Sequence, residues 1–100
     1  MKHIFLICAA GLSTGMMVEK MKKAAADTAY ECEIRAIGKN MAESIVSKAD
    51  CILLGPQIRF ELNNIKAIAG EVPVDIIDMK DYGRMNGAAV LEQAKELIGE

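Results

Sequence analysis

The residues best suited to chemistry lie together between positions 8 and 15, where a cysteine opens a run of small and hydroxyl-bearing residues. This run is Cys-Ala-Ala-Gly-Leu-Ser-Thr-Gly. Gly11 and its small neighbours let the backbone curl so that several N–H groups point inward and form a nest for an anion. Ser13 and Thr14 add hydroxyl groups that can cap a helix or reach the same anion. Cys8 lies where these groups converge.

The loop joins an apolar segment to the start of a predicted helix, whose free N–H groups and dipole also attract an anion. This environment favours the thiolate, which is the nucleophilic form of cysteine. After attack on a phosphoryl donor, the same N–H groups would hold the phosphate oxygens on sulfur. We therefore predict that Cys8 becomes phosphorylated and that the phosphate is bound by the residues that follow it, Ala9, Ala10, Gly11, Leu12, Ser13, Thr14 and Gly15. A buried structural cysteine is the alternative, but it needs neither the glycine nor the hydroxyls.

Strands and helices alternate along the rest of the chain. Short apolar runs predict buried strands at 3–7, 51–54 and 72–77, and the alternating run at 32–37 predicts an edge strand. Amphipathic spacing predicts helices at 16–26, 40–49, 60–69 and 88–98, with Asn40 as an N-cap and residues 78–87 as a loop or single turn.

This alternation predicts an α/β fold, namely one doubly wound domain over residues 1–100 with a four-stranded parallel sheet flanked by helices. Strand order 2-1-3-4 would place the ligand site between the first and third strands, beyond their carboxyl ends. The loops that begin at Cys8 and Gly55 would meet there. Asp78 and Tyr82 follow the fourth strand at the same edge. Cys32 and Cys51 open their strands at the opposite edge, about 9.6 Å apart and too far to form a disulfide.

Composition narrows the classes of function. The chain has 100 residues, 52% of them hydrophobic, and a formal net charge of -2. It shows no basic stripe with interleaved aromatics, so we expect no nucleic-acid partner. It has no apolar run of membrane-spanning length and no signal peptide core, so we expect no membrane insertion and a reducing, cytoplasmic compartment with free thiols. His3 has no neighbouring ligand set, so we expect no metal site. In-line transfer to and from the Cys8 thiolate would need no organic cofactor either.

Three segments carry a family resemblance. Residues 4–14, Ile-Phe-Leu-Ile-Cys-Ala-Ala-Gly-Leu-Ser-Thr, resemble the cysteine loop of the lactose/cellobiose (diacetylchitobiose) enzyme IIB components of the bacterial phosphoenolpyruvate-dependent sugar phosphotransferase system. Residues 53–58, Leu-Leu-Gly-Pro-Gln-Ile, resemble the family's second signature, and Asp78 with Tyr82-Gly83 resembles the third. The resemblance covers essentially the whole chain. Some members of the family carry Ser where this chain has Gly15, and the glycine removes a hydroxyl but no backbone N–H.

The resemblance implies a phosphoryl carrier in sugar uptake. Cys8 would accept the group from a phosphohistidine of enzyme IIA and pass it to a sugar bound by the membrane component, enzyme IIC. The sugar would be a beta-glucoside or a related disaccharide, and the family sheet has the order 2-1-3-4. Adaptable apolar side chains around Cys8 would suit two partners in turn; our candidates for these contacts are Met16, Met17, Ile58, Phe60 and Tyr82.

Two other classes of function stay open. A low-molecular-weight-type cysteine phosphatase has a similar loop, but Arg follows its Cys after five residues, and here Thr14 holds that place. Without Arg, the loop lacks the bidentate contacts that stabilise a transferring phosphoryl group. A non-catalytic phosphate-binding module would not need the thiol. A redox role is weaker, since no second cysteine lies near Cys8 in sequence. The sequence leaves open the roles of four charged residues near the predicted site, Arg59, Asp78, Asp81 and Arg84.

Overall fold

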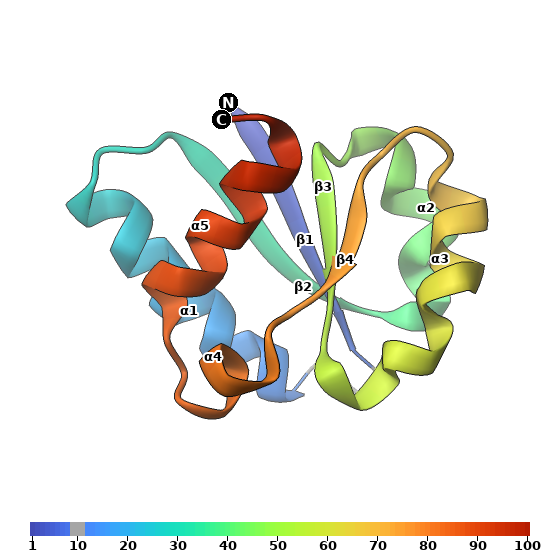
Figure 1. The fold of residues 1–100 in the computed structure, drawn as a ribbon. Helices are drawn as coiled ribbons and strands as arrows, with labels where there is room; N and C mark the ends of the chain where they lie inside the picture. Colours follow the sequence, from blue (N-terminus) through green and yellow to red (C-terminus); the bar gives the residue numbers. More distant parts are fainter. Residues whose placement is uncertain (9–11) are drawn as a thin grey trace.

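Four parallel strands form the middle layer of the molecule, and helices cover both faces of the sheet (Figure 1). The computed structural model describes residues 1–8 and 12–100, with the backbone alone at residues 12 and 13. The strand order is β2-β1-β3-β4, which confirms the predicted topology. The strands are β1 (Lys2–Cys8), β2 (Cys32–Gly38), β3 (Cys51–Leu54) and β4 (Val74–Ile76).

The strand register brings the ends of the three neighbouring strands together. Cys8, the last residue of β1, pairs with Gly38, the last residue of β2. On the other side of β1, Ile7 pairs with Leu54, the last residue of β3. The central strands are buried on both faces, as their unbroken apolar sequences predict. The loops after these strands therefore start at one edge of the sheet.

The helices divide into two layers and one short cap. In Figure 1, α1 and α5 lie on one face of the sheet and α2 and α3 on the other, while α4 lies near the end where β3 runs into its following turn. The α-helices are α1 (Leu12–Asp27), α2 (Ala42–Ile45), α3 (Leu62–Ala69), α4 (Met79–Gly83) and α5 (Gly87–Ile98). Three 3₁₀ turns accompany them, η1 (Lys39–Met41), η2 (Val46–Lys48) and η3 (Pro56–Glu61).

Alternate residues of the central strands serve two separate cores. Ile4 and Leu6 of β1 pack with Met17 and Met21 of α1 and with α5. Ile7 faces the other way and joins the cluster formed by β3, α2 and α3. Because the side chains of a strand point alternately to opposite faces, one short strand fastens both helical layers. Cys8 ends the strand that both cores hold in place.

The structure corrects three local predictions. The helix expected at 40–49 is broken into η1, the single-turn α2 and η2. Asn40 is not its N-cap, because η1 begins at Lys39 and the cap position is held by Gly38, which makes no side-chain hydrogen bond. Within this segment Met41 is exposed and Ala42 is buried. The helix expected from residue 60 is preceded by η3, which begins at Pro56, a residue whose fixed φ suits the first position of a helix.

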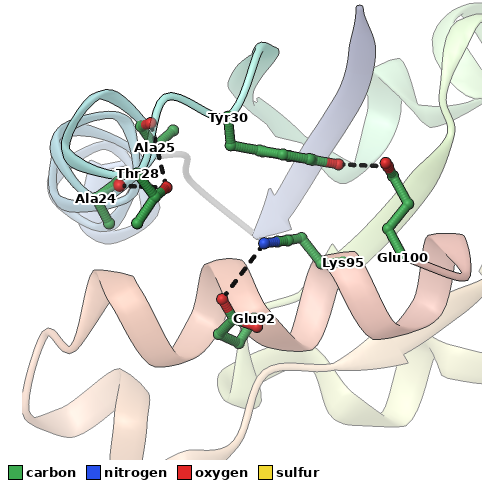
Figure 2. Close-up of polar contacts among 7 residues, drawn as sticks. All are labelled: Ala24, Ala25, Thr28, Tyr30, Glu92, Lys95 and Glu100. Carbon is green, nitrogen blue, oxygen red and sulfur yellow. Dashed lines mark hydrogen bonds and ion pairs between the residues drawn. The ribbon is translucent and has the colours of Figure 1, made fainter.

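The end of α5 is fastened to the start of β2 by a polar contact far from Cys8. The Tyr30 hydroxyl donates to Glu100 Oε1 at 2.7 Å (Figure 2). Lys95 Nζ lies 4.9 Å from the centroid of the Tyr30 ring and pairs with Glu92. Burial, together with the Glu100 carboxylate, holds the pKa of Tyr30 above its ordinary value. The phenol therefore stays protonated and continues to donate at neutral pH.

Gly87 allows α5 to approach α1 closely. A β-carbon at Gly87 would lie 2.4 Å from the carbonyl carbon of Lys20 and 2.6 Å from its oxygen. These are backbone atoms of a helix, so they cannot move aside as a flexible side chain would. Gly87 is buried, whereas Gly83 of α4 has no atom within 4 Å of the corresponding position.

We predict that Gly87→Ala lowers the free energy of unfolding by about 2 kcal/mol, because overpacking forces the two helices apart. Urea denaturation followed by circular dichroism measures the effect. Gly83→Ala is the matched control and should leave stability unchanged or slightly raised. Equal stability of the Gly87→Ala variant and the parent protein would contradict this account of the α1–α5 contact.

Candidate active site

Cys8 lies at the carboxyl end of β1, at the edge of the sheet where the predicted site was placed. The next strand is fixed against it, because the Gly55 N–H donates to the Ile7 carbonyl oxygen at 2.9 Å. Gly55 also packs directly beside Cys8, since a β-carbon added to Gly55 would lie 3.6 Å from Cys8 Cβ. The side chain of Cys8 is buried, with 4% of its surface exposed. The structure therefore brings together the two loop origins expected from the strand order.

The Thr14 hydroxyl is directed at the sulfur of Cys8. Thr14 Oγ1 donates to Cys8 Sγ at 3.1 Å, and Thr14 is fully buried. Thr14 belongs to the first turn of α1, which starts at Leu12, earlier than the predicted residue 16. A hydrogen bond to a thiolate is stronger than one to a neutral thiol. Thr14 therefore orients the Cys8 thiol from inside the first turn of α1.

The start of α1 also brings backbone donors to the site. The first N–H groups of a helix have no partner within it, and here they belong to the second half of the cysteine loop, from Leu12 onward. The positive end of the helix dipole lies at the same place. Of the predicted phosphate-binding residues, Ala9, Ala10 and Gly11 lie outside the described residues, and Leu12, Ser13, Thr14 and Gly15 lie in the first turn of α1. Phosphate binding by these residues stays a prediction.

The other two cysteines have a different environment. Burial and the neighbouring Asp50 carboxylate raise the pKa of Cys51 to about 12, and burial raises the pKa of Cys32. Both thiols are therefore protonated at neutral pH and are poor nucleophiles. None of the three cysteines forms a disulfide, and Cys32 and Cys51 start strands on either side of β1, as predicted.

A mostly apolar groove of about 280 Å³ adjoins the site. One wall comes from η3, which follows Gly55, and the other comes from α4, which follows β4. Asp78 caps α4 by accepting from the N–H groups of Lys80 and Asp81, which gives Asp78 a structural role. The groove is lined by Pro56, Gln57, Arg59, Met79, Tyr82 and Gly83.

The structure divides the predicted partner contacts into exposed and buried side chains. Met16 and Phe60 are exposed by 61% and 74% and can meet a partner. Met17 and Ile58 are buried in the two cores, which argues against a direct contact of either side chain with a partner. Tyr82 is mostly buried but lines the groove. Met79, which was not among the predicted contacts, is exposed and lines the groove. Its place directly after the helix cap Asp78 is the sequence signal that could have identified it.

The remaining candidates have ordinary surroundings. Arg59 Nη1 donates to the Pro56 carbonyl oxygen at 3.2 Å, and Arg84 is an exposed residue at the end of α4. Among the described residues, no group of three His, Cys, Asp or Glu side chains could hold a metal ion. None of the helices described is long and apolar enough to cross a membrane.

A larger cavity, of about 670 Å³, lies away from Cys8. It is lined by the last turns of α1 and the first residues of β2, including Lys22, Tyr30 and Glu33. These residues belong to the opposite edge of the sheet from the Cys8 loop. The size of a cavity therefore does not identify the site. The site is identified by the thiol of Cys8, which lies where the ends of the central strands meet the start of α1.

Comparison with known proteins identifies close similarity over nearly the whole chain. The family model described as "PTS system, Lactose/Cellobiose specific IIB subunit" matches residues 3–93. The chain is 44% identical to the cellobiose-specific EIIB component of the PTS system from Lactococcus lactis subsp. lactis, covering 97% of this chain and 96% of the relative. It is 39% identical to the oligo-beta-mannoside-specific EIIB component of Bacillus subtilis, covering 98% and 97%.

Solved structures agree with this similarity. The cellobiose-specific phosphotransferase IIB component of Borrelia burgdorferi has a TM-score of 0.82 and 35% identity, covering 98% of this chain and 92% of that one. The lactose-specific IIB domain of Streptococcus pneumoniae has a TM-score of 0.85, with 95% of each chain covered. Its identity of 16% makes this second match evidence for the fold alone.

We predict that iodoacetamide alkylates Cys8 before it alkylates Cys32 and Cys51. We also predict that Thr14→Val slows the reaction at Cys8 roughly fivefold, because the variant loses one hydrogen bond of about 1 kcal/mol. Peptide mass spectrometry over a time course at pH 7.5 measures the reaction at each cysteine. Thr14→Ser keeps the hydroxyl and should react at nearly the parent rate. An unchanged rate at Cys8 in Thr14→Val would show that the hydroxyl does not activate the thiol.

Proposed function

Because this chain belongs to the lactose/cellobiose-specific IIB subunits of the PTS system, we propose that its role in sugar uptake is to carry a phosphoryl group on Cys8. The family assigns the chain to the phosphotransferases. The observation that carries the proposal for Cys8 is its contact with Thr14: a buried hydroxyl donates to its sulfur at the N-terminus of α1. A structural cysteine gains nothing from this arrangement, whereas a thiolate nucleophile does.

The first step loads the carrier. The Cys8 thiolate attacks the phosphorus of a phosphohistidine on enzyme IIA, so that an S–P bond forms as the P–N bond breaks. The imidazole nitrogen leaves with the electron pair of that bond. Backbone N–H groups at the start of α1 would stabilise the oxygens of the phosphoryl group, on which negative charge is spread.

The second step unloads it. A hydroxyl oxygen of a sugar bound by the membrane component, enzyme IIC, attacks the phosphorus, and the S–P bond breaks. Cys8 leaves as the thiolate, which the Thr14 hydroxyl again stabilises. The hydroxyl proton passes to a base in the sugar-bound component. The acceptor in this proposal is a beta-glucoside or a related disaccharide, chosen by enzyme IIC, and the reaction uses no metal or organic cofactor.

The side chain at position 14 favours transfer over hydrolysis. A phosphatase loop of this length has Arg there, and its bidentate contacts stabilise the charged transition state. The buried Thr14 offers one neutral hydroxyl, and that hydroxyl faces sulfur. Water attack on phospho-Cys8 therefore lacks a strong electrostatic stabiliser from this residue. A carrier requires slow hydrolysis, because the S–P bond must last until the acceptor arrives at the cytoplasmic face of the membrane.

Mass spectrometry after incubation with phosphoenolpyruvate, the two general phosphotransferase proteins and an enzyme IIA tests the proposal. We predict one added phosphate on Cys8, absent without enzyme IIA and absent in Cys8→Ser. Cys32→Ser is the matched control and should be phosphorylated like the parent.

The cellobiose-specific relative from Lactococcus lactis, treated in parallel, confirms that the enzyme IIA is active. Phosphate on another residue, or its presence on the Cys8→Ser variant, would contradict the proposal. Steady hydrolysis of a phosphate ester through Cys8 would favour the phosphatase alternative.

A further inference from the structure

We propose that the carboxamide of Gln57 binds the phosphoryl group on Cys8 and orients it for transfer. This inference rests on the proposed function and adds to it a residue from the turn after β3. Gln57 is the second residue of η3, which begins at Pro56, and it lines the groove beside Cys8.

The position of the Gln57 side chain follows from the contacts of Gly55. A β-carbon at Gly55 would lie 2.9 Å from Gln57 Oε1 and 3.6 Å from Cys8 Cβ. The carboxamide and the cysteine side chain therefore flank the same small space, which the missing side chain of Gly55 leaves open. Gly55 has φ -59 and ψ 144, a conformation that any residue can adopt. A β-carbon at this position would displace the flexible end of the Gln57 side chain and would leave the backbone where it is.

The backbone that carries Gln57 is held on both sides. Pro56 and Ile58 are buried, and the Ile58 N–H donates to the Gly55 carbonyl oxygen at 3.1 Å. The ring of Pro56 also fixes its own φ. Gln57 between them is exposed, so its side chain extends from a rigid turn. This support gives the carboxamide a fixed base from which to reach the group on Cys8.

In this structure the oxygen of the Gln57 carboxamide lies next to Gly55, and a half-turn about the terminal torsion presents the two N–H donors to the same space. The Gln57 side chain makes no hydrogen bond to the part of the chain that the structure describes, although it lies beside a buried thiol. Other polar groups near this edge are engaged: Arg59 donates to the Pro56 carbonyl oxygen, and Lys39, which follows the end of β2, pairs with Glu61. A carboxamide has two N–H donors, and phosphoryl oxygens are strong acceptors.

A neutral donor suits the two-way chemistry of this site. In both steps the phosphorus exchanges one bond, between the Cys8 sulfur and an atom of the partner, while its three oxygens stay bonded to it. Gln57 would hold those oxygens by donating to them and would exchange no proton. A guanidinium at the same place would add a full charge and stabilise attack by water as well as by the partner. The carboxamide supplies orientation without that charge.

Gln57→Ala tests this proposal in the single-turnover transfer from phosphorylated enzyme IIA to Cys8. We expect the maximal rate to fall roughly tenfold, the effect of one lost hydrogen bond to a charged group, with the half-saturating concentration of enzyme IIA unchanged. The phosphorus NMR shift of phospho-Cys8 should also move, which a loss of docking would not cause. Asn63→Ala removes an exposed amide from α3 and is the matched control.

Gly55→Ala gives a second, independent test because its new β-carbon displaces the Gln57 carboxamide while the backbone stays unstrained. We expect a similar loss of rate in Gly55→Ala. The double variant should be no slower than Gln57→Ala, since both changes remove the same contact.

The outcomes separate this inference from the function on which it rests. A parent protein that takes no phosphate on Cys8 defeats the proposed function itself. A parent that is phosphorylated, together with a Gln57→Ala variant that matches it in rate and in phosphorus shift, overturns only the role of Gln57. Additive losses in the double variant would also overturn that role.

Discussion

The site depends on how firmly the end of β1 is held. This strand lies between β2 and β3, and its alternate side chains enter the two separate cores of the molecule. Cys8 is its last residue, and the bond from the Gly55 N–H to the Ile7 oxygen joins the neighbouring strand one residue earlier. The burial that stabilises the fold therefore also fixes the nucleophile. The Thr14 hydroxyl at the start of α1 can then contact Cys8, and η3 follows directly after Gly55 beside it.

Much of this arrangement was predictable because it follows from apolar patterning. Unbroken apolar runs mark β1 and β3, the mixed run from Cys32 marks the edge strand β2, and parallel pairing places Cys8 beside Gly55. The burial of Cys51 agreed with its place in an apolar strand, and burial explains its raised pKa. The early start of α1 at Leu12 was missed because Gly15 and the hydroxyl residues are weak helix formers. In the structure, Thr14 lies in that first turn and its hydroxyl donates to the sulfur of Cys8.

Features that depend on three-dimensional contacts could not be predicted in the same way. Asn40 has the chemistry of a cap, yet the chain after β2 turns as 3₁₀ and leaves it unused. Ile58 and Phe60 are both large and apolar in one short turn, but one is buried and the other exposed. The hydrogen bond from Thr14 to Cys8 and the packing of Gln57 over Gly55 join residues whose side-chain directions no pattern specifies. These contacts turn a recognisable loop into a definite chemical arrangement.

The central claim is that Cys8 is a carrier, and the fate of its phosphate tests this most directly. The protein can be phosphorylated, freed from its donor, and followed by phosphorus NMR in buffer and after addition of unphosphorylated enzyme IIA. Our account predicts that the S–P bond outlasts the transfer time by orders of magnitude in buffer and is lost quickly, back to the histidine, once enzyme IIA is present. Loss to water at the same rate in both conditions would contradict it, because Cys8 would then be the centre of a hydrolase.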